Sequence, residues 1–280
     1  MTKFLKFVGV LVIVIFIVGL CMFFGNPVSK MLVTHSAEKY LKENFSDTDF
    51  EIGTVNYDFK TSNYYVCVVS PSSADSSFTI YAGLNGEIDY HSYEDAVMKK
   101  WNTATRINDD YREAVDVVLG NPDFPYDSDI GFGDISFTTE DILDYGFGTL
   151  DAPPEYAIKT ESLELDKVYD VNEFGKKAGV LTIYVYDEDV SYEKLAEILL
   201  GIRKIMDEAE VCFYVIDCVL EYPKSENLEE WRDDRVEVSA FLYDDIYEDG
   251  LVERVRKSDE KVKAYYAWLD EFIDSIETEV

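Results

Sequence analysis

Side chains that commonly act as nucleophiles, bases or metal ligands are few and scattered in this chain of 280 residues. The two histidines, His35 and His91, lack the close spacing to each other or to a cysteine that zinc sites use. A Cys67–His91 dyad would require the fold to bring the two side chains together, and a thiol in a buried strand is normally unreactive. The sequence contains no nucleophile elbow, zinc-protease motif, phosphate-binding loop or dinucleotide-binding glycine pattern. We therefore assign no catalytic, cofactor-binding or metal-binding residue; the sequence favours a non-enzymatic role and leaves enzymatic activity open.

Carboxylates are the one abundant reactive group, with 57 Asp and Glu residues. Two carboxyls that flank one glycosidic bond can catalyse its hydrolysis, but so many acids form pairs by chance. Asp217 stands out because it lies inside an apolar stretch, where burial would raise its pKa. An exposed strand end or an arginine partner is the simpler explanation. A carboxylate-dependent extracytoplasmic hydrolase remains an alternative function.

Calcium binding is the other chemistry that acidic clusters suggest. The segment Asp127-Ser-Asp-Ile-Gly131 begins like a calcium loop but has no acid at its fifth position or glycine at its sixth. Thr138 also stands where the closing glutamate would be. A second acidic run, Asp187-Glu-Asp189, fits a strand-to-helix turn with anions near a helix start. A calcium-responsive module is a further alternative.

The four cysteines do not form a recognisable disulfide framework. Cys21 lies in an apolar N-terminal segment, and Cys67, Cys212 and Cys218 fall in stretches that we expect to be apolar strands. We place Cys212 and Cys218 on the same side of one strand, too far apart to bond each other. Buried free thiols are the expected state.

Residues 7–24 contain no charged residue or polar amide. As a helix these 18 residues would extend about 27 Å, close to the hydrocarbon thickness of a bilayer. We therefore predict a short tail and single-pass transmembrane anchor over residues 1–26, with the lipid bilayer as a partner through residues 7–24. Lys3 and Lys6 favour a cytoplasmic tail and extracytoplasmic C-terminal domains at the cell membrane. A lipoprotein modified at Cys21 and a cleaved signal peptide are the alternatives.

The charge balance excludes one class of partner. The first 24 residues contain two lysines and no acids, so the remainder has 23 basic and 57 acidic residues, a net charge of −34. Nucleic acid and anionic membrane surfaces would repel such a chain. Solubility is the simplest explanation of the charge, and binding of cations or basic partners is the sharper one.

The pattern over residues 27–120 predicts a membrane-proximal α+β domain. Pro27 suits the first turn of a helix to Phe45, and alternating strands follow with a bulge at Gly53. Asn85-Gly86 marks a hairpin turn. Ser92 fits the cap of a long helix that ends near Leu119. We expect the order helix, antiparallel meander, helix.

Several runs in this domain carry a family resemblance. They are Tyr40-Leu-Lys42, Tyr57-Asp-Phe-Lys60, Tyr65-Val-Cys-Val-Val-Ser-Pro-Ser-Ser73, Asp75 and Phe78. On these residues the chain resembles the YfjL-like family of uncharacterised, membrane-anchored bacterial proteins, best over residues 28–120. The resemblance implies a shared fold and anchor but no chemistry. The element order is also similar to PepSY-type modules, by topology alone.

Residues 121–160 are predicted to be an irregular acidic linker, and residues 161–280 a second α+β sandwich domain. Apolar strands over 179–186 and 211–220 flank a helix capped by Ser191, and we expect these strands to be parallel. A strand with one polar face spans 235–243. A final helix carries a stripe that we expect to face the core. That stripe is Val262, Tyr265, Leu269, Phe272, Ile273 and Ile276.

These observations favour a membrane-anchored, strongly acidic extracytoplasmic binding or interaction module with no recognisable active site. Tyrosine-lined grooves would perform the recognition, because tyrosine offers rigid amphipathic contact area. The partner would be a protein or another component of the cell envelope, and the sequence leaves the oligomeric state open.

Overall fold

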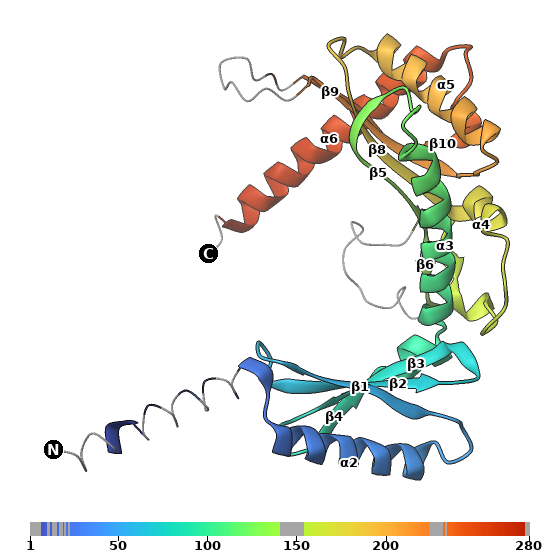
Figure 1. Ribbon diagram of the computed structural model, residues 1–280. Coiled ribbons are helices and arrows are strands. Elements are labelled where there is room, and N and C mark those ends of the chain that lie inside the picture. The colour runs from blue at the N-terminus through green and yellow to red at the C-terminus, as the bar shows by residue number, and fades with distance from the viewer. Residues whose placement is uncertain are drawn as a thin grey trace. The chain divides into compact units, whose positions relative to one another are not determined.

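The structure is a computed structural model that describes residues 23–140, 154–223 and 234–277, together with residues 7–9, 12, 16, 19, 21 and 232. Two compact units divide this chain. Unit 1 comprises residues 1–104 and 160–167, and unit 2 comprises residues 105–159 and 168–280. Each unit contains its own sheet and helices (Figure 1).

The structure corrects the transmembrane part of the predicted fold. In the described part of the chain, no helix is both long enough and apolar enough to cross a membrane. A crossing needs about 20 consecutive apolar residues, whereas the long helices described here carry charged residues along their length. The predicted anchor over residues 7–24 and the single-pass cell-membrane localisation are therefore not supported. Residues 1–6 and about half of 7–24 lie outside the described residues.

Unit 1 is a four-stranded antiparallel sheet with one helix packed on a face. Its elements are α2 (Pro27–Asn44), β1 (Glu51–Asp58), β2 (Asn63–Ser70), β3 (Ser73–Ala82), β4 (Ile88–His91), the π-helix η1 (Glu94–Met98) and the 3-10 helix η3 (Thr160–Ser162). The strand order is β1-β2-β3-β4, which is the predicted meander. Asn26 caps α2 by accepting a hydrogen bond from the Ser29 amide, and Pro27 occupies the first turn as expected. The register shifts between Ile52 and Val55, which confirms the bulge at Gly53.

The long helix predicted after Ser92 is divided. It consists of η1 and a separate helix, α3 (Trp101–Leu119). Lys100 adopts the left-handed conformation with φ of 59°, and no helix continues through such a residue. Contacts group most of α3 with unit 2, whereas the predicted first domain extended to residue 120.

Unit 2 is a mixed sheet in the order β10-β9-β8-β5. Its elements after α3 are β5 (Asp127–Ile135), β6 (Phe137–Thr138), β7 (Ile158–Lys159), α4 (Val171–Ala178), β8 (Gly179–Tyr186), α5 (Tyr192–Glu208), β9 (Val215–Glu221), β10 (Arg235–Leu242), the 3-10 helix η4 (Tyr243–Asp245) and α6 (Leu251–Glu277). β8 and β9 are parallel on either side of α5, as predicted, and Ser191 caps α5. β5 pairs antiparallel with β8 inside the segment that was predicted to be an irregular linker.

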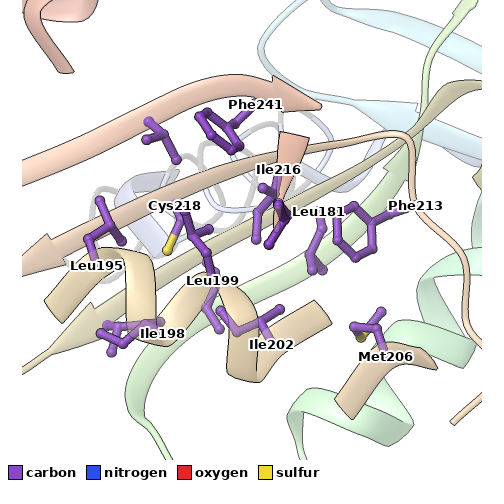
Figure 2. Close-up of a cluster of buried hydrophobic side chains, with 14 of the residues drawn as sticks. Leu181, Leu195, Ile198, Leu199, Ile202, Met206, Phe213, Ile216, Cys218 and Phe241 are labelled. Atoms are coloured by element: carbon purple, nitrogen blue, oxygen red, sulfur yellow. The ribbon is translucent and has the colours of Figure 1, made fainter. Parts of the chain in front are cut away.

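One face of this sheet forms the main core of unit 2. Leu195, Leu199 and Ile202 of α5 pack on Leu181 of β8 and Ile216 of β9 (Figure 2). Val115 and Tyr111 of α3 join the same cluster. Gly133 of β5 permits their approach, since an added Cβ there would lie 2.5 Å from Val115 Cγ2. The opposite face of the sheet carries the residues that alternate with these.

Candidate functional site

The opposite face of the unit 2 sheet and α6 enclose a groove of about 530 Å³. Its lining is Thr182, Tyr184, Asp217, Val219, Arg235, Glu237, Val238, Ser239, Lys261, Val262, Tyr265 and Tyr266. Strand alternation explains the sheet side of the groove, because Thr182 and Tyr184 alternate with the core residues Leu181 and Ile183. The groove combines tyrosine rings with a few charged groups, the composition expected of a recognition surface.

Asp217 lies at the floor of this groove and has a structural role. Its Oδ1 accepts hydrogen bonds from the Ser239 hydroxyl at 2.8 Å and the Ala240 amide at 2.7 Å. Ala240 has a φ of 46°, and the register of β10 against β9 shifts between Val238 and Phe241. Asp217 therefore holds a bulge in β10. Neither a strand end nor an arginine explains this residue, and sequence reasoning missed its actual partners.

Arg235 and Glu237 form a charged pair beside Asp217. The Arg235 guanidinium donates to the Glu237 carboxylate and lies 3.9 Å from Glu221 Oε1. Burial lowers the pKa of Arg235, but the adjacent Glu237 carboxylate outweighs burial, and the pKa is raised overall. Asp217 and Glu237 are thus both engaged in internal contacts.

A fully buried carboxylate, Asp259, joins α6 to the edge of the sheet. It accepts hydrogen bonds from the Glu237 amide at 3.1 Å, the Tyr192 hydroxyl at 3.0 Å and Lys263 Nζ at 2.7 Å. Because β10 is an edge strand, the Glu237 amide would otherwise have no strand to pair with. The pKa of Lys263 is raised chiefly by its hydrogen bond to Asp259. Burial, followed by the hydrogen bond to Asp259, raises the pKa of Tyr192.

The second half of α6 exposes a large aromatic surface, which corrects the prediction of a core-facing stripe. Tyr265, Tyr266, Trp268, Phe272 and Ile273 are each 43–48% exposed, and α6 continues beyond the sheet toward the C-terminus (Figure 1). The side chain of Ile276 lies outside those described. The spacing correctly identified an apolar face, but the described chain covers that face only in part. We call this surface the α6 aromatic face; Tyr265 and Tyr266 also line the groove.

The other candidate residues do not assemble into a reactive site. His91 pairs with Ile80 on the core side of the unit 1 sheet, with its ring 5.6 Å from that of Tyr40. Cys67 alternates with the buried Val66 and Val68 and therefore lies on the other face. The fold does not bring Cys67 and His91 together. His35 lies in α2.

The two acidic segments form a strand and a turn. Asp127–Gly131 lies in β5 rather than in a calcium loop, and Asp129 accepts a hydrogen bond from the Tyr186 hydroxyl at 2.7 Å. Asp187 accepts from the Asp189 amide before α5, which lowers the pKa of Asp187. Among the residues that the structure describes, no three His, Cys, Asp or Glu side chains converge as metal ligands.

All four cysteines are free. Cys218 is buried in β9, and burial raises the pKa of its thiol to about 12. Cys212 is only half-buried and precedes β9, so the two residues do not share one strand as predicted. Cys67 is also only half-buried.

Comparison with known families identifies the family of this chain. Residues 1–92 match the YfjL-like N-terminal domain, and residues 110–256 match the YfjL-like C-terminal domain. The chain belongs to the YfjL-like family. This confirms the resemblance noted in unit 1 and extends it through most of unit 2 of this YfjL-like protein. Neither a curated protein nor a solved structure matches the chain.

Proposed function

We propose that this YfjL-like protein is an acidic interaction module that binds a polypeptide partner through the groove of unit 2 and the α6 aromatic face. The observation that supports this proposal is the exposure of Tyr265, Tyr266, Trp268 and Phe272 on one helix, continuous with the groove. Contiguous exposed apolar surfaces of this kind commonly mark interaction sites.

Approximate energies favour the aromatic residues as the source of affinity. Covering a half-exposed tyrosine or tryptophan removes roughly 100 Å² from water, which is worth about 2.5 kcal/mol. An exposed ion pair contributes about 0–1 kcal/mol. Several rings together therefore outweigh any contribution from Lys261 or Arg235 at the groove. Tyrosine and tryptophan are also the side chains most enriched among the residues that dominate binding energy at interfaces.

Site-specific photo-cross-linking tests this proposal. A benzoylphenylalanine at position 265 in the full-length chain, produced in its own cells, should give a discrete adduct whose second polypeptide is identified by mass spectrometry. The same label at the exposed Ala267, on the opposite side of α6, is the matched control and should give none. Combining Tyr184→Ala with Tyr266→Ser should lower the adduct yield at least ~fivefold, since these rings supply contact area. Absence of an adduct at position 265, or equal adducts at 265 and 267, would overturn the proposal.

A further inference from the structure

The three- and four-residue spacing of α6 continues from its packed half into its exposed half, and Asp259 is its one polar position. Val255, Asp259, Val262, Tyr266, Leu269 and Ile273 follow one another in alternating steps of four and three residues, and Ile276 continues the pattern in the sequence. Residues spaced alternately by three and four lie in one row along a helix, and such a row forms the contact when two helices pack lengthwise. We call this row the α6 seam.

The two ends of the α6 seam have different environments. Val255 and Asp259 are fully buried within unit 2, whereas Tyr266 is 48% and Ile273 45% exposed. Tyr265 and Phe272 flank the exposed part of the seam, seven residues apart. The exposed seam therefore offers a second helix the same kind of contact that unit 2 makes with the first half.

Charge is distributed unequally along α6. Its first half carries five basic residues, and its second half carries four acidic residues and no basic one. The basic residues are Arg254, Arg256, Lys257, Lys261 and Lys263, accompanied by Glu253, Asp259 and Glu260; the acidic residues of the second half are Asp270, Glu271, Asp274 and Glu277. A second α6 that runs in the opposite direction and overlaps the exposed half places Lys261 and Lys263 beside the acidic second half, whereas a parallel copy places like charges together. The helix is complementary to its own antiparallel copy.

We propose that the partner on the α6 aromatic face is a second copy of this chain, bound through antiparallel pairing of the two α6 seams. This inference rests on the proposed function of that surface and names its occupant. The pairing sets Tyr266 of one copy against Leu269 of the other, and Val262 against Ile273. The arrangement is a two-fold symmetric contact, which closes as a dimer.

One charged pair fixes the direction of the two helices. Lys263 and Asp270 are seven residues apart and flank the same side of the seam. In the antiparallel dimer, Lys263 of each copy meets Asp270 of the other. Lys263 donates to Asp259 at 2.7 Å, yet its side chain is 59% exposed and its ammonium has further protons to donate.

Sedimentation velocity of the full-length chain tests whether the dimer depends on the seam. Ile273→Asp places a charge in the exposed seam and should raise the dimer dissociation constant at least ~100-fold. Since Ile273 is 45% exposed, the variant should keep the fold, and the circular dichroism spectrum should stay unchanged. Any association through other residues, including residues 1–24, is common to all variants, so the comparison isolates α6. Unchanged association of Ile273→Asp would overturn the proposal.

A matched charge reversal tests the direction of pairing. Asp270→Lys and Glu271→Lys each change the net charge of −32 by the same amount, but Glu271 lies opposite the seam. Asp270→Lys should weaken the dimer about tenfold by facing Lys263 of the other copy. Glu271→Lys should leave it unchanged or tighten it, because overall repulsion falls. Equal effects of the two variants would overturn antiparallel pairing.

The two proposals can fail separately. A monomeric wild-type chain at about 100 μM, together with a cross-linked adduct of another protein at position 265, would overturn self-pairing and leave the interaction surface intact. An adduct between two copies of this chain supports both. A monomer without any adduct overturns both.

Discussion

The first and second halves of α6 carry the same spacing of apolar residues and differ in what covers them. In the first half, Leu251 and Val255 are buried against the rest of unit 2, and Asp259 caps the edge of β10. In the second half, the aromatic residues of the same helix are half exposed. Helical spacing therefore reveals an apolar face, while the surface that covers it depends on where the sheet ends.

The strongest test of this contrast is a pair of truncations. Leu251→Ala should lower the free energy of unfolding by about 3 kcal/mol, because Leu251 is 2% exposed and its removal leaves a cavity. Ile273→Ala should lower it by less than about 0.5 kcal/mol in the monomer, because surface truncations cost little. Urea unfolding at submicromolar protein concentration measures both. Similar losses for the two variants would show that the second half is covered within the monomer.

The buried carboxylate should have the next largest effect. Asp259→Ala removes the acceptor for the Glu237 amide and the Tyr192 hydroxyl, and should cost about 2–3 kcal/mol. Asp259→Asn retains one acceptor oxygen and should cost less. Hydrogen exchange at the Glu237 amide should accelerate in both variants. An unchanged exchange rate in Asp259→Ala would contradict the edge-capping role.

The loss of stability at alkaline pH should also depend on the hydrogen bonds that Tyr192 and Lys263 donate to Asp259. The pKa of Tyr192 is raised from 10.0 and that of Lys263 from 10.5, so the folded state holds both protons more tightly than the unfolded state. Their contribution is fully present below about pH 10 and is lost as pH rises through the folded values. Tyr192→Phe should cost about 1 kcal/mol at pH 8 and flatten the decline above pH 10. Urea unfolding between pH 8 and 11 measures the slope, and an unaltered slope in the variant would assign the decline to other groups.

The smallest effect is expected in the strand that the first half of α6 covers. Ala240 adopts a φ of 46° in the β10 bulge, a conformation that glycine reaches without strain. Ala240→Gly should therefore raise the free energy of unfolding by about 0.5 kcal/mol, which a slightly higher melting temperature would reveal. Ala114→Gly, inside α3, is a matched control and should lower the free energy of unfolding by about 1 kcal/mol. A loss in both variants would mean that the bulge does not strain Ala240.

Local signals predicted much of the fold. Pro27, Gly53 and Ser191 each mark a conformation or cap that few other residues supply, and the structure places all three as expected. The apolar runs of β8 and β9 likewise indicated a parallel pair. The chain pattern was less informative for β5, because its glycines and aspartates are typical of loops. Those glycines serve close packing against α3, which only the assembled sheet reveals.

The candidate site could be predicted only in part. Tyrosine content suggested a recognition groove, but the strands and helix that line it come together only in the fold. The role of Asp217 depends on a bulge in a neighbouring strand, and that of Asp259 on an edge amide. Both are long-range contacts without a local sequence signature. The prediction of a membrane span over residues 7–24 was wrong for a related reason, because it rested on composition alone.

The hydrogen bond from the Glu237 amide to Asp259 also has a consequence for proteolysis. An open strand border can recruit further strands, and α6 closes the border of β10. A protease that removed α6 would expose that border together with the core beneath Leu251. The clipped chain should then form insoluble polymers, so the lifetime of α6 in the cell would govern the lifetime of the protein.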